Sequence, residues 1–161
     1  MMTREQFIGN VKREQGALMR FLIALCCGDH DDASDIAQET LIKAYIALDR
    51  YDEREQFAAW IRRIAYNTFT NQRKKRQREA TQPIEQARNI TGGQEADSTF
   101  ANEELHRALA TLPHSERTAI VLHYIEGFKI NEITQITGCS EAAVKKQLQR
   151  GREQLKRRIT R

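Results

Sequence analysis

A helix-turn-helix near the C-terminus is predicted by the stretch INEITQITGCSEAAVKKQLQR, residues 130–150. Isoleucines at helical spacing predict a short helix over residues 130–137, and Gly138 with Cys139 predicts the turn. Ser140 is a favoured N-cap residue, so a longer second helix is expected to start there. The side chains expected to close the small core between the two helices are Ile133, Ile136, Val144 and Leu148.

The second helix of this motif presents a small, polar and basic face away from that core. Side chains of these types near the start of a helix can enter the major groove of DNA, reach base edges and hold phosphates. Glu141 leaves two interpretations open, a contact with cytosine or a favourable charge at the helix N-terminus. The residues expected to contact duplex DNA are Ser140, Glu141, Ala142, Lys145, Lys146, Gln149 and Arg150.

Charge along the rest of the chain is zoned in a way that favours a nucleic-acid partner. The 161 residues carry a formal net charge of +4, and the pI is about 9.1. Basic residues gather over 73–78 and again over 145–161, whereas residues 85–104 hold five acidic side chains and one arginine. Solvated helix ends are the alternative explanation of each basic run, but two such runs at the ends of two helical units favour DNA.

The fold class expected is all-α, because no segment alternates apolar and polar residues long enough to predict a strand. Helical periodicity predicts helices over about 3–27, 31–48 and 56–78, and it resumes from Leu105 to about Gly127. The polar stretch between these helices holds few large apolar residues, which is typical of a linker. We expect two small helical domains on a tether rather than one compact core: residues 1–79 and 102–161, joined by a flexible linker over 80–101.

The helix expected over residues 31–48 has an apolar strip opposite its core face. Ala33 and Ile36 belong to the core face, while Ile42 and Ile46 lie on the other side among acidic and amide groups. Such a strip suits a protein partner, because the isoleucines supply affinity and the acids supply orientation. Burial of both sides within the domain is the alternative. The residues expected to bind this partner are Asp35, Gln38, Glu39, Ile42 and Lys43.

The helix expected over residues 56–78 combines basic and aromatic side chains on one side. This combination suits single-stranded DNA, because cations follow the phosphates while a ring or an amide engages an unstacked base. Phe57 and Trp60 lie on the apolar side and are more typical of a core than of a base contact. The residues expected to bind the strand are Arg62, Arg63, Tyr66, Asn67, Asn71, Arg73 and Lys74.

Catalytic and metal-binding motifs are absent from the sequence. It holds no phosphate-binding glycine loop, no metal-binding histidine pair and no nucleophile beside a base, so we expect no enzyme, no metal and no cofactor. Cys26, Cys27 and Cys139 are interpreted as small buried residues. No targeting segment and no apolar stretch of membrane length is present, which predicts a cytoplasmic protein without membrane insertion.

In order and spacing these segments resemble the sigma factors of the extracytoplasmic function (ECF) class. Residues 35–40 with 43–45 resemble the core-polymerase-binding segment of that family, and residues 57–67 resemble its promoter-melting segment. Residues from Leu109 to Arg152 follow the pattern of its minus-thirty-five-binding domain, although Thr134 stands where the family usually has alanine. The resemblance implies core RNA polymerase, duplex promoter DNA and the melted minus-ten strand as partners, and for many members an anti-sigma factor.

Three other classes are compatible with parts of the sequence. A repressor could use the same helix-turn-helix, but it needs a dimer interface and another partner for the apolar strip. A nuclease or recombinase would need residues that assist Tyr66 or Tyr124, and none is evident. A purely structural protein leaves the outward Lys145, Lys146 and Gln149 unexplained. The expected function is therefore promoter-specific transcription initiation with core RNA polymerase.

Overall fold

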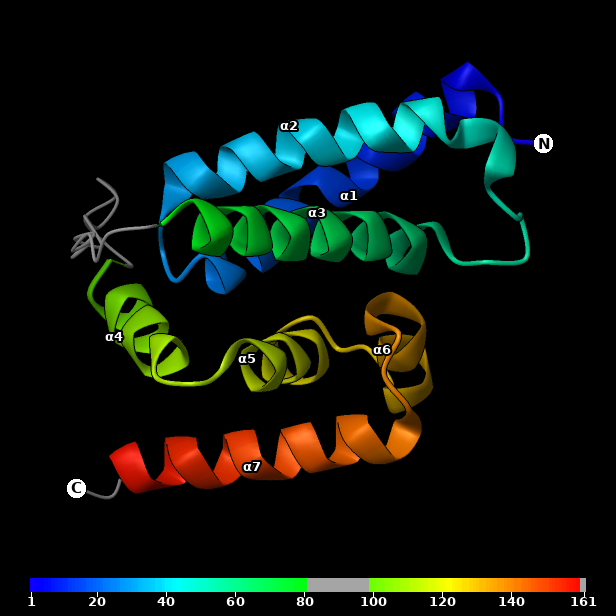
Figure 1. Cartoon of the computed structure of the whole chain (residues 1–161). Helices are drawn as coiled ribbons and strands as arrows, with labels where there is room; N and C mark the ends of the chain where they lie inside the picture. The colour runs from blue at the N-terminus through cyan, green and yellow to red at the C-terminus, as the bar shows by residue number, and fades with distance from the viewer. Residues whose placement is uncertain (81–98, 160–161) are drawn as a thin grey trace.

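The computed structural model describes residues 1–80 and 99–159, and every regular element in these ranges is a helix (Figure 1). The N-terminal unit consists of α1 (Arg4–Leu25), α2 (His30–Ile46), the short 3-10 helix η1 (Leu48–Arg50) and α3 (Phe57–Glu79). The C-terminal unit consists of α4 (Thr99–Ala110), α5 (His114–Ile120), the π-helical turn η2 (Val121–Ile125), α6 (Ile130–Thr137) and α7 (Glu141–Ile159). The all-α expectation is confirmed. The linker expected over 80–101 lies largely outside the described residues.

Local sequence signals set the boundaries of the first two helices. Thr3 and Gln6 form a capping box at the start of α1, since each side chain accepts a hydrogen bond from the backbone N–H of the other. The helix ends where Cys27 and Gly28 adopt positive φ angles of 55° and 94°. Asp29 then caps α2 by accepting a hydrogen bond from the backbone N–H of Asp32 at 3.1 Å.

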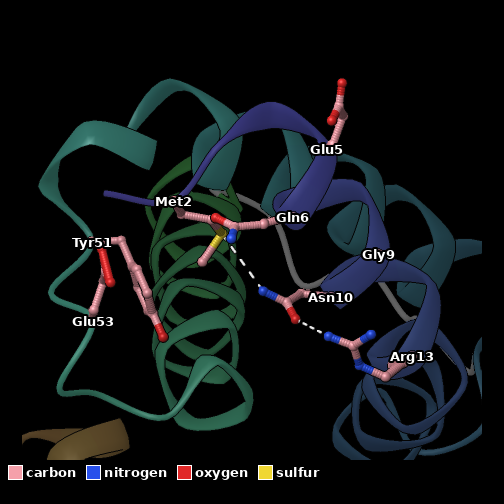
Figure 2. A pocket seen from close by; sticks show the side chains of 8 residues that line it. All are labelled: Met2, Glu5, Gln6, Gly9, Asn10, Arg13, Tyr51 and Glu53. Carbon is pink, nitrogen blue, oxygen red and sulfur yellow. Dashed lines mark hydrogen bonds between the residues drawn. The ribbon is translucent and has the colours of Figure 1, made fainter.

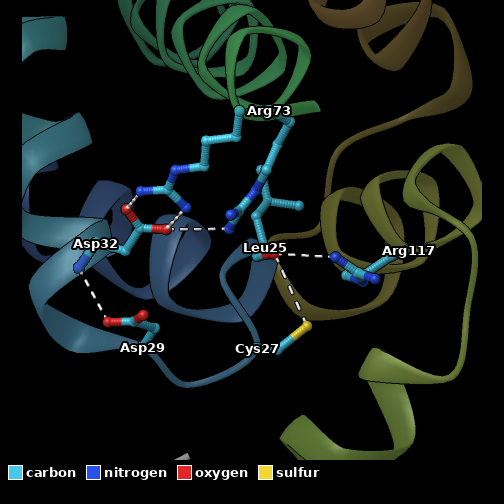
Figure 3. Close-up of polar contacts among 7 residues, drawn as sticks. Leu25, Cys27, Asp29, Asp32, Arg73 and Arg117 are labelled. Atoms are coloured by element: carbon cyan, nitrogen blue, oxygen red, sulfur yellow. Dashed lines mark hydrogen bonds and ion pairs between the residues drawn. The ribbon is translucent and has the colours of Figure 1, made fainter. Parts of the chain in front are cut away.

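An ion-pair cluster around the buried Asp32 joins the first turn of α2 to the C-terminal part of α3 (Figure 3). The side chain of Asp32 is 4% exposed and accepts hydrogen bonds from Arg76 Nη2 at 2.6 Å and Arg76 Nη1 at 3.1 Å. Arg73 Nη2 donates to the same carboxylate at 3.1 Å. Two residues of the basic run 73–78 therefore have a structural role that the sequence did not reveal.

The first residues of the chain are held against the segment between η1 and α3. Met2 is buried, and the terminal amino group of Met1 forms an ion pair with Glu53. Asn10 of α1 donates a hydrogen bond to Met2 Sδ at 3.6 Å. The polar hollow in Figure 2 lies between these parts, lined by Met2, Glu5, Gln6, Gly9, Asn10, Arg13, Tyr51 and Glu53.

The C-terminal unit contains the predicted helix-turn-helix with the predicted boundaries. Gly138 ends α6 at a φ of 79°, and Ser140 Oγ caps α7 by accepting from the backbone N–H of Ala143 at 3.1 Å. Open space surrounds the position where a Cβ would stand on Gly138, so the backbone angle alone favours glycine there. All four predicted core residues, Ile133, Ile136, Val144 and Leu148, are buried.

Gly151 marks the closest approach of α7 to α5. A Cβ at this position would lie 2.7 Å from Cγ1 and 3.0 Å from Cδ1 of Ile120, which is buried. We expect Gly151→Ala to lower the free energy of unfolding, because an overpacking cost of about 1–3 kcal/mol exceeds the gain of about 1 kcal/mol in helix propensity. Gly16→Ala is the control: its Cβ would meet only the end of Arg20 at 3.6 Å, so it should stabilise the chain. Urea denaturation tests this, and equal stabilisation by both changes would contradict it.

The two helical units are confirmed, but they pack against each other. In Figure 1, α5 and α6 lie between α3 and α7. Helix α6 contacts α3, while α4, α5 and η2 contact α1. The buried apolar side chains form one cluster that includes Phe69 of the N-terminal unit and Phe128 of the C-terminal unit. Units this small bury a limited share of their apolar surface alone, and contact between them buries more.

Candidate polymerase and promoter interfaces

The helix-turn-helix face is open to solvent. Ser140, Glu141, Ala142, Lys145, Lys146, Gln149 and Arg150 are all exposed, as expected for a surface that enters a DNA groove. Lys145 Nζ lies 3.9 Å from a carboxylate oxygen of Glu141, one helical turn earlier. This exposed pair is weak, so the Lys145 ammonium group can exchange Glu141 for a phosphate at little cost. The seven residues extend from the N-cap of α7 to the middle of that helix.

The predicted partner strip of α2 is also exposed. Ile42 and Ile46 are 60% and 67% exposed, so burial of both sides of this helix within the domain is wrong. Asp35, Gln38, Glu39 and Lys43 surround Ile42 and are exposed as well. Lys43 forms an ion pair with Glu39 at 3.0 Å and donates to Thr68 Oγ1 of α3 at 3.3 Å. The strip is thus an apolar surface with a charged margin, the pattern expected for a protein interface.

The predicted strand-binding face of α3 is divided in this conformation. Asn67, Asn71 and Lys74 are exposed, whereas Arg63, Tyr66 and Arg73 are half-buried and Arg62 is only 2% exposed. Arg63 pairs with Glu55 at 3.3 Å, and Arg73 belongs to the Asp32 cluster. Trp60 is buried and Phe57 is partly buried against the core, so both are core residues here, as their pattern indicated.

Arg62 is buried between the two units. Its Nη1 donates to Glu14 of α1 at 2.9 Å and to the backbone oxygen of Ala58 at 3.0 Å. Its Nε and Nη2 donate to Glu126 of the C-terminal unit at 3.0 Å and 2.6 Å. The guanidinium carbon also lies 5.0 Å from the ring centroid of Phe128. The helical pattern placed Arg62 on the outward side of α3, and this side is covered by the other unit.

Two further contacts join the units along the same side of the N-terminal bundle. The ring of His114 stacks on Tyr66 with centroids 5.5 Å apart and planes at 9°, and it lies 5.1 Å from the ring of Phe69. Burial, with the charges of Arg117 and Arg73, lowers the pKa of His114 to about 4, so the ring is neutral at neutral pH. Arg117 Nη1 donates to the backbone oxygen of Leu25 at 3.1 Å, as Figure 3 shows.

Glu126, His114 and Arg117 were not predicted as functional residues. Each contacts a residue far away in the sequence, which neither periodicity nor charge runs could indicate. The sequence also did not indicate an apolar groove on the C-terminal unit, because four helical elements contribute to it: α4, α5, η2 and α7. Its lining consists of Leu105, Leu109, Ile120, Tyr124, Ile125, Arg152, Leu155 and Lys156.

Of the three cysteines, only Cys26 is fully buried. Cys26 is buried, and burial raises the pKa of its thiol to about 12, so the thiol stays protonated. Cys27 and Cys139 are half-buried, and all three thiols are free.

Within residues 1–80 and 99–159, no cluster of three or more His, Cys, Asp or Glu side chains could hold a metal ion. Among the helices of those same ranges, none combines the length and apolarity needed to span a membrane.

Comparison with known proteins defines the class. Residues 11–79 match the family model of Sigma-70 region 2, and residues 102–155 match that of Sigma-70 region 4. The N-terminal unit with its α2 strip is thus a sigma region 2, and the unit with the helix-turn-helix is a region 4. Proteins with both regions are RNA polymerase sigma factors.

Relatives place the chain more closely. It is 32% identical over 142 residues to the ECF RNA polymerase sigma factor EcfG of Rhodopseudomonas palustris (strain TIE-1), covering 86% of this chain and 77% of that protein. It is 30% identical over 145 residues to the ECF RNA polymerase sigma factor SigW of Bacillus subtilis (strain 168), covering 82% and 78%. The chain belongs to the ECF class of RNA polymerase sigma factors. It binds core RNA polymerase and promoter DNA and directs promoter-specific transcription initiation, as the sequence resemblance implied.

A solved structure shares the fold over both units. The sigma factor RpoE from Bartonella quintana, crystallised with the anti-sigma factor NepR, superposes with a TM-score of 0.82 at 28% identity. The match covers 97% of this chain and 98% of that chain. CnrH, solved in complex with the cytosolic domain of CnrY, has a TM-score of 0.76 at 23% identity and supports the fold.

Proposed function

We propose that three separate faces of this chain make different contacts during transcription initiation: one with core RNA polymerase, one with duplex DNA and one with the melted strand. The observation that carries this proposal is the exposure of the α2 strip and of the helix-turn-helix face on different units. We assign residues 1–79 to region 2, residues 80–101 to a linker and residues 102–161 to region 4. Each unit then presents its own binding surface, and polymerase aligns the two on the promoter.

The α2 strip is proposed to bind core RNA polymerase. Ile42 supplies apolar area at the centre, and Asp35, Gln38, Glu39 and Lys43 supply directional polar contacts around it. Removing the exposed Ile42 side chain from water lowers the free energy of the complex, so the apolar centre supplies most of the affinity. The charged side chains around it set the orientation of the partner.

The DNA contacts are proposed to divide between α7 and α3. Ser140, Glu141, Ala142, Lys145, Lys146, Gln149 and Arg150 read the duplex minus-thirty-five element in the major groove. Arg62, Arg63, Tyr66, Asn67, Asn71, Arg73 and Lys74 hold the melted minus-ten strand, with basic groups on phosphates and Tyr66 against a base. Lys74 and Asn71 are exposed for this contact, while Arg62 requires the units to separate.

The subunit is proposed to act without bond chemistry of its own, as a cytoplasmic specificity factor. Its residues bind, orient and separate DNA strands, and polymerase supplies the catalysis. We also propose an anti-sigma factor as a partner. The resemblance to RpoE, which was solved with the anti-sigma factor NepR, supports this proposal.

The polymerase face can be tested by Ile42→Asp. A carboxylate at the centre of the strip should weaken binding to bacterial core RNA polymerase about thirtyfold, because losing a central apolar contact costs about 2 kcal/mol. Binding is measured by biolayer interferometry with the full chain. Ile8→Asp on α1 is the matched control, since Ile8 is also exposed, at 46%. An equal loss of polymerase affinity in both variants, or no loss in either, would contradict the assignment of this face.

A further inference from the structure

The closed arrangement of the two units covers part of the surface assigned to the melted strand. The Arg62 side chain is 3% exposed, and the Glu126 carboxylate that pairs with it is 5% exposed. The four hydrogen bonds that the Arg62 guanidinium group donates all go to three acceptors within the protein: Glu14, Glu126 and the Ala58 carbonyl. No phosphate can reach Arg62 in this state.

The groups that cover this surface imitate the chemistry of a strand. Glu126 offers Arg62 an anionic oxygen at 2.6 Å, as a phosphate would. His114 stacks its neutral ring on Tyr66 with nearly parallel planes, as an unpaired base would. Because Glu126 occupies one hydrogen-bonding edge of the Arg62 guanidinium group and His114 occupies one face of the Tyr66 ring, strand binding and closure compete for the same atoms.

The other two faces remain free in the closed state. The helix-turn-helix residues and the α2 strip are exposed while Arg62 and Tyr66 are covered. Closure therefore blocks strand capture without blocking the first contact with polymerase or with duplex DNA.

We propose that the chain inhibits itself, with region 4 covering the strand-binding side of α3 and the Arg62–Glu126 ion pair serving as the latch. The inference rests on the assignment of α3 to the melted strand. It concerns contacts within one chain, so no separate inhibitor is needed for closure. Binding to polymerase favours opening to the extent that the open form makes additional contacts there.

Glu126→Gln tests the latch, because it keeps the shape of the side chain and removes its charge. Arg62 then keeps its ion pair with Glu14 but loses the anionic partner on the other unit, and removing one charge of a buried ion pair weakens the interface that it crosses. Two properties of the full chain are measured: the radius of gyration by small-angle X-ray scattering, and the affinity for a fluorescent single-stranded oligonucleotide of random A/T sequence. We expect a larger radius and about tenfold tighter strand binding, the gain expected if about nine-tenths of the wild-type chain is closed.

Controls separate the latch from general effects of charge. Glu153→Gln makes the same chemical change on the exposed surface of α7 and should alter neither property. Adding Arg62→Ala to Glu126→Gln should keep the larger radius and remove the gain in strand affinity. His114→Ala removes the stacked ring at a different point and should also open the chain, so the proposal stays testable if Glu126→Gln fails to fold by circular dichroism.

The two measurements distinguish failure of the latch from failure of the proposed strand site. An unchanged radius in folded Glu126→Gln and His114→Ala overturns the latch, whatever the DNA result. A larger radius without tighter strand binding overturns the assignment of α3 to the strand, and the inhibitory meaning of closure with it.

Discussion

Replacing Asp32 by alanine is expected to lower the free energy of unfolding of the N-terminal unit by about 3 kcal/mol. The carboxylate is 4% exposed and neutralises Arg73 and Arg76, which are 35% and 41% exposed. A hydrogen bond to a charged group contributes about 1.5–3 kcal/mol, and three such bonds end on this carboxylate; the arginines left behind can turn to water, which keeps the loss well below the sum of the three. Such a loss is a large share of the stability of a small domain.

Urea denaturation followed by circular dichroism measures this effect. Asp35→Ala is the matched control, because Asp35 is exposed on the same helix and should change stability by less than about 0.5 kcal/mol. Similar midpoints for the two variants would show that the Asp32 cluster adds no net stability. The Asp32 cluster also fixes the positions of Arg73 and Arg76, two members of the basic run 73–78. Its loss would therefore change the basic surface that is available to DNA.

A double charge reversal, Lys145→Glu with Lys146→Glu, is expected to weaken binding of the full chain to duplex DNA about a hundredfold. Both ammonium groups are exposed at the start of α7, where a helix can lie in the major groove. Each group lost from a phosphate or base edge costs about 1–3 kcal/mol. The slope of log K against log salt should also become shallower by about 1.8, because two phosphate contacts are lost.

Fluorescence anisotropy at several salt concentrations measures both quantities without knowledge of the promoter. Lys12→Glu with Arg20→Glu is the matched control, since both residues are exposed on α1 and the change in net charge is identical. If the control pair weakened binding and flattened the salt dependence equally, net charge rather than the α7 face would govern DNA affinity.

Local signals were sufficient to predict the helices and the exposure of two of the three proposed faces. Thr3, Asp29 and Ser140 cap helices, and Gly138 ends α6 with the positive φ that its position requires. Helix capping and apolar periodicity involve residues within one or two helical turns of each other. Both signals can therefore be read directly from the sequence. The exposed strip around Ile42 could be predicted because one helix presents both its core side and its partner side.

The third face could not be predicted fully, because its state depends on the other unit. Periodicity correctly placed Arg62 and Tyr66 outside the core of region 2, yet Glu126 and His114 cover them. Arg73 carries the charge expected for DNA but is bound to Asp32, a partner 41 residues away. Nothing in a basic run shows which of its members already has an acidic partner.

The order of residues thus determined that the chain is all-helical, that it ends in a helix-turn-helix and that its segments follow the pattern of an ECF sigma factor. These properties arise from short-range backbone preferences and from the spacing of apolar side chains. The tertiary structure alone decided that the two units close on each other and that Arg62 is buried between Glu14 and Glu126. The physical reason is that burial and ion pairing depend on distances between segments remote in sequence, which exist only after the units have packed.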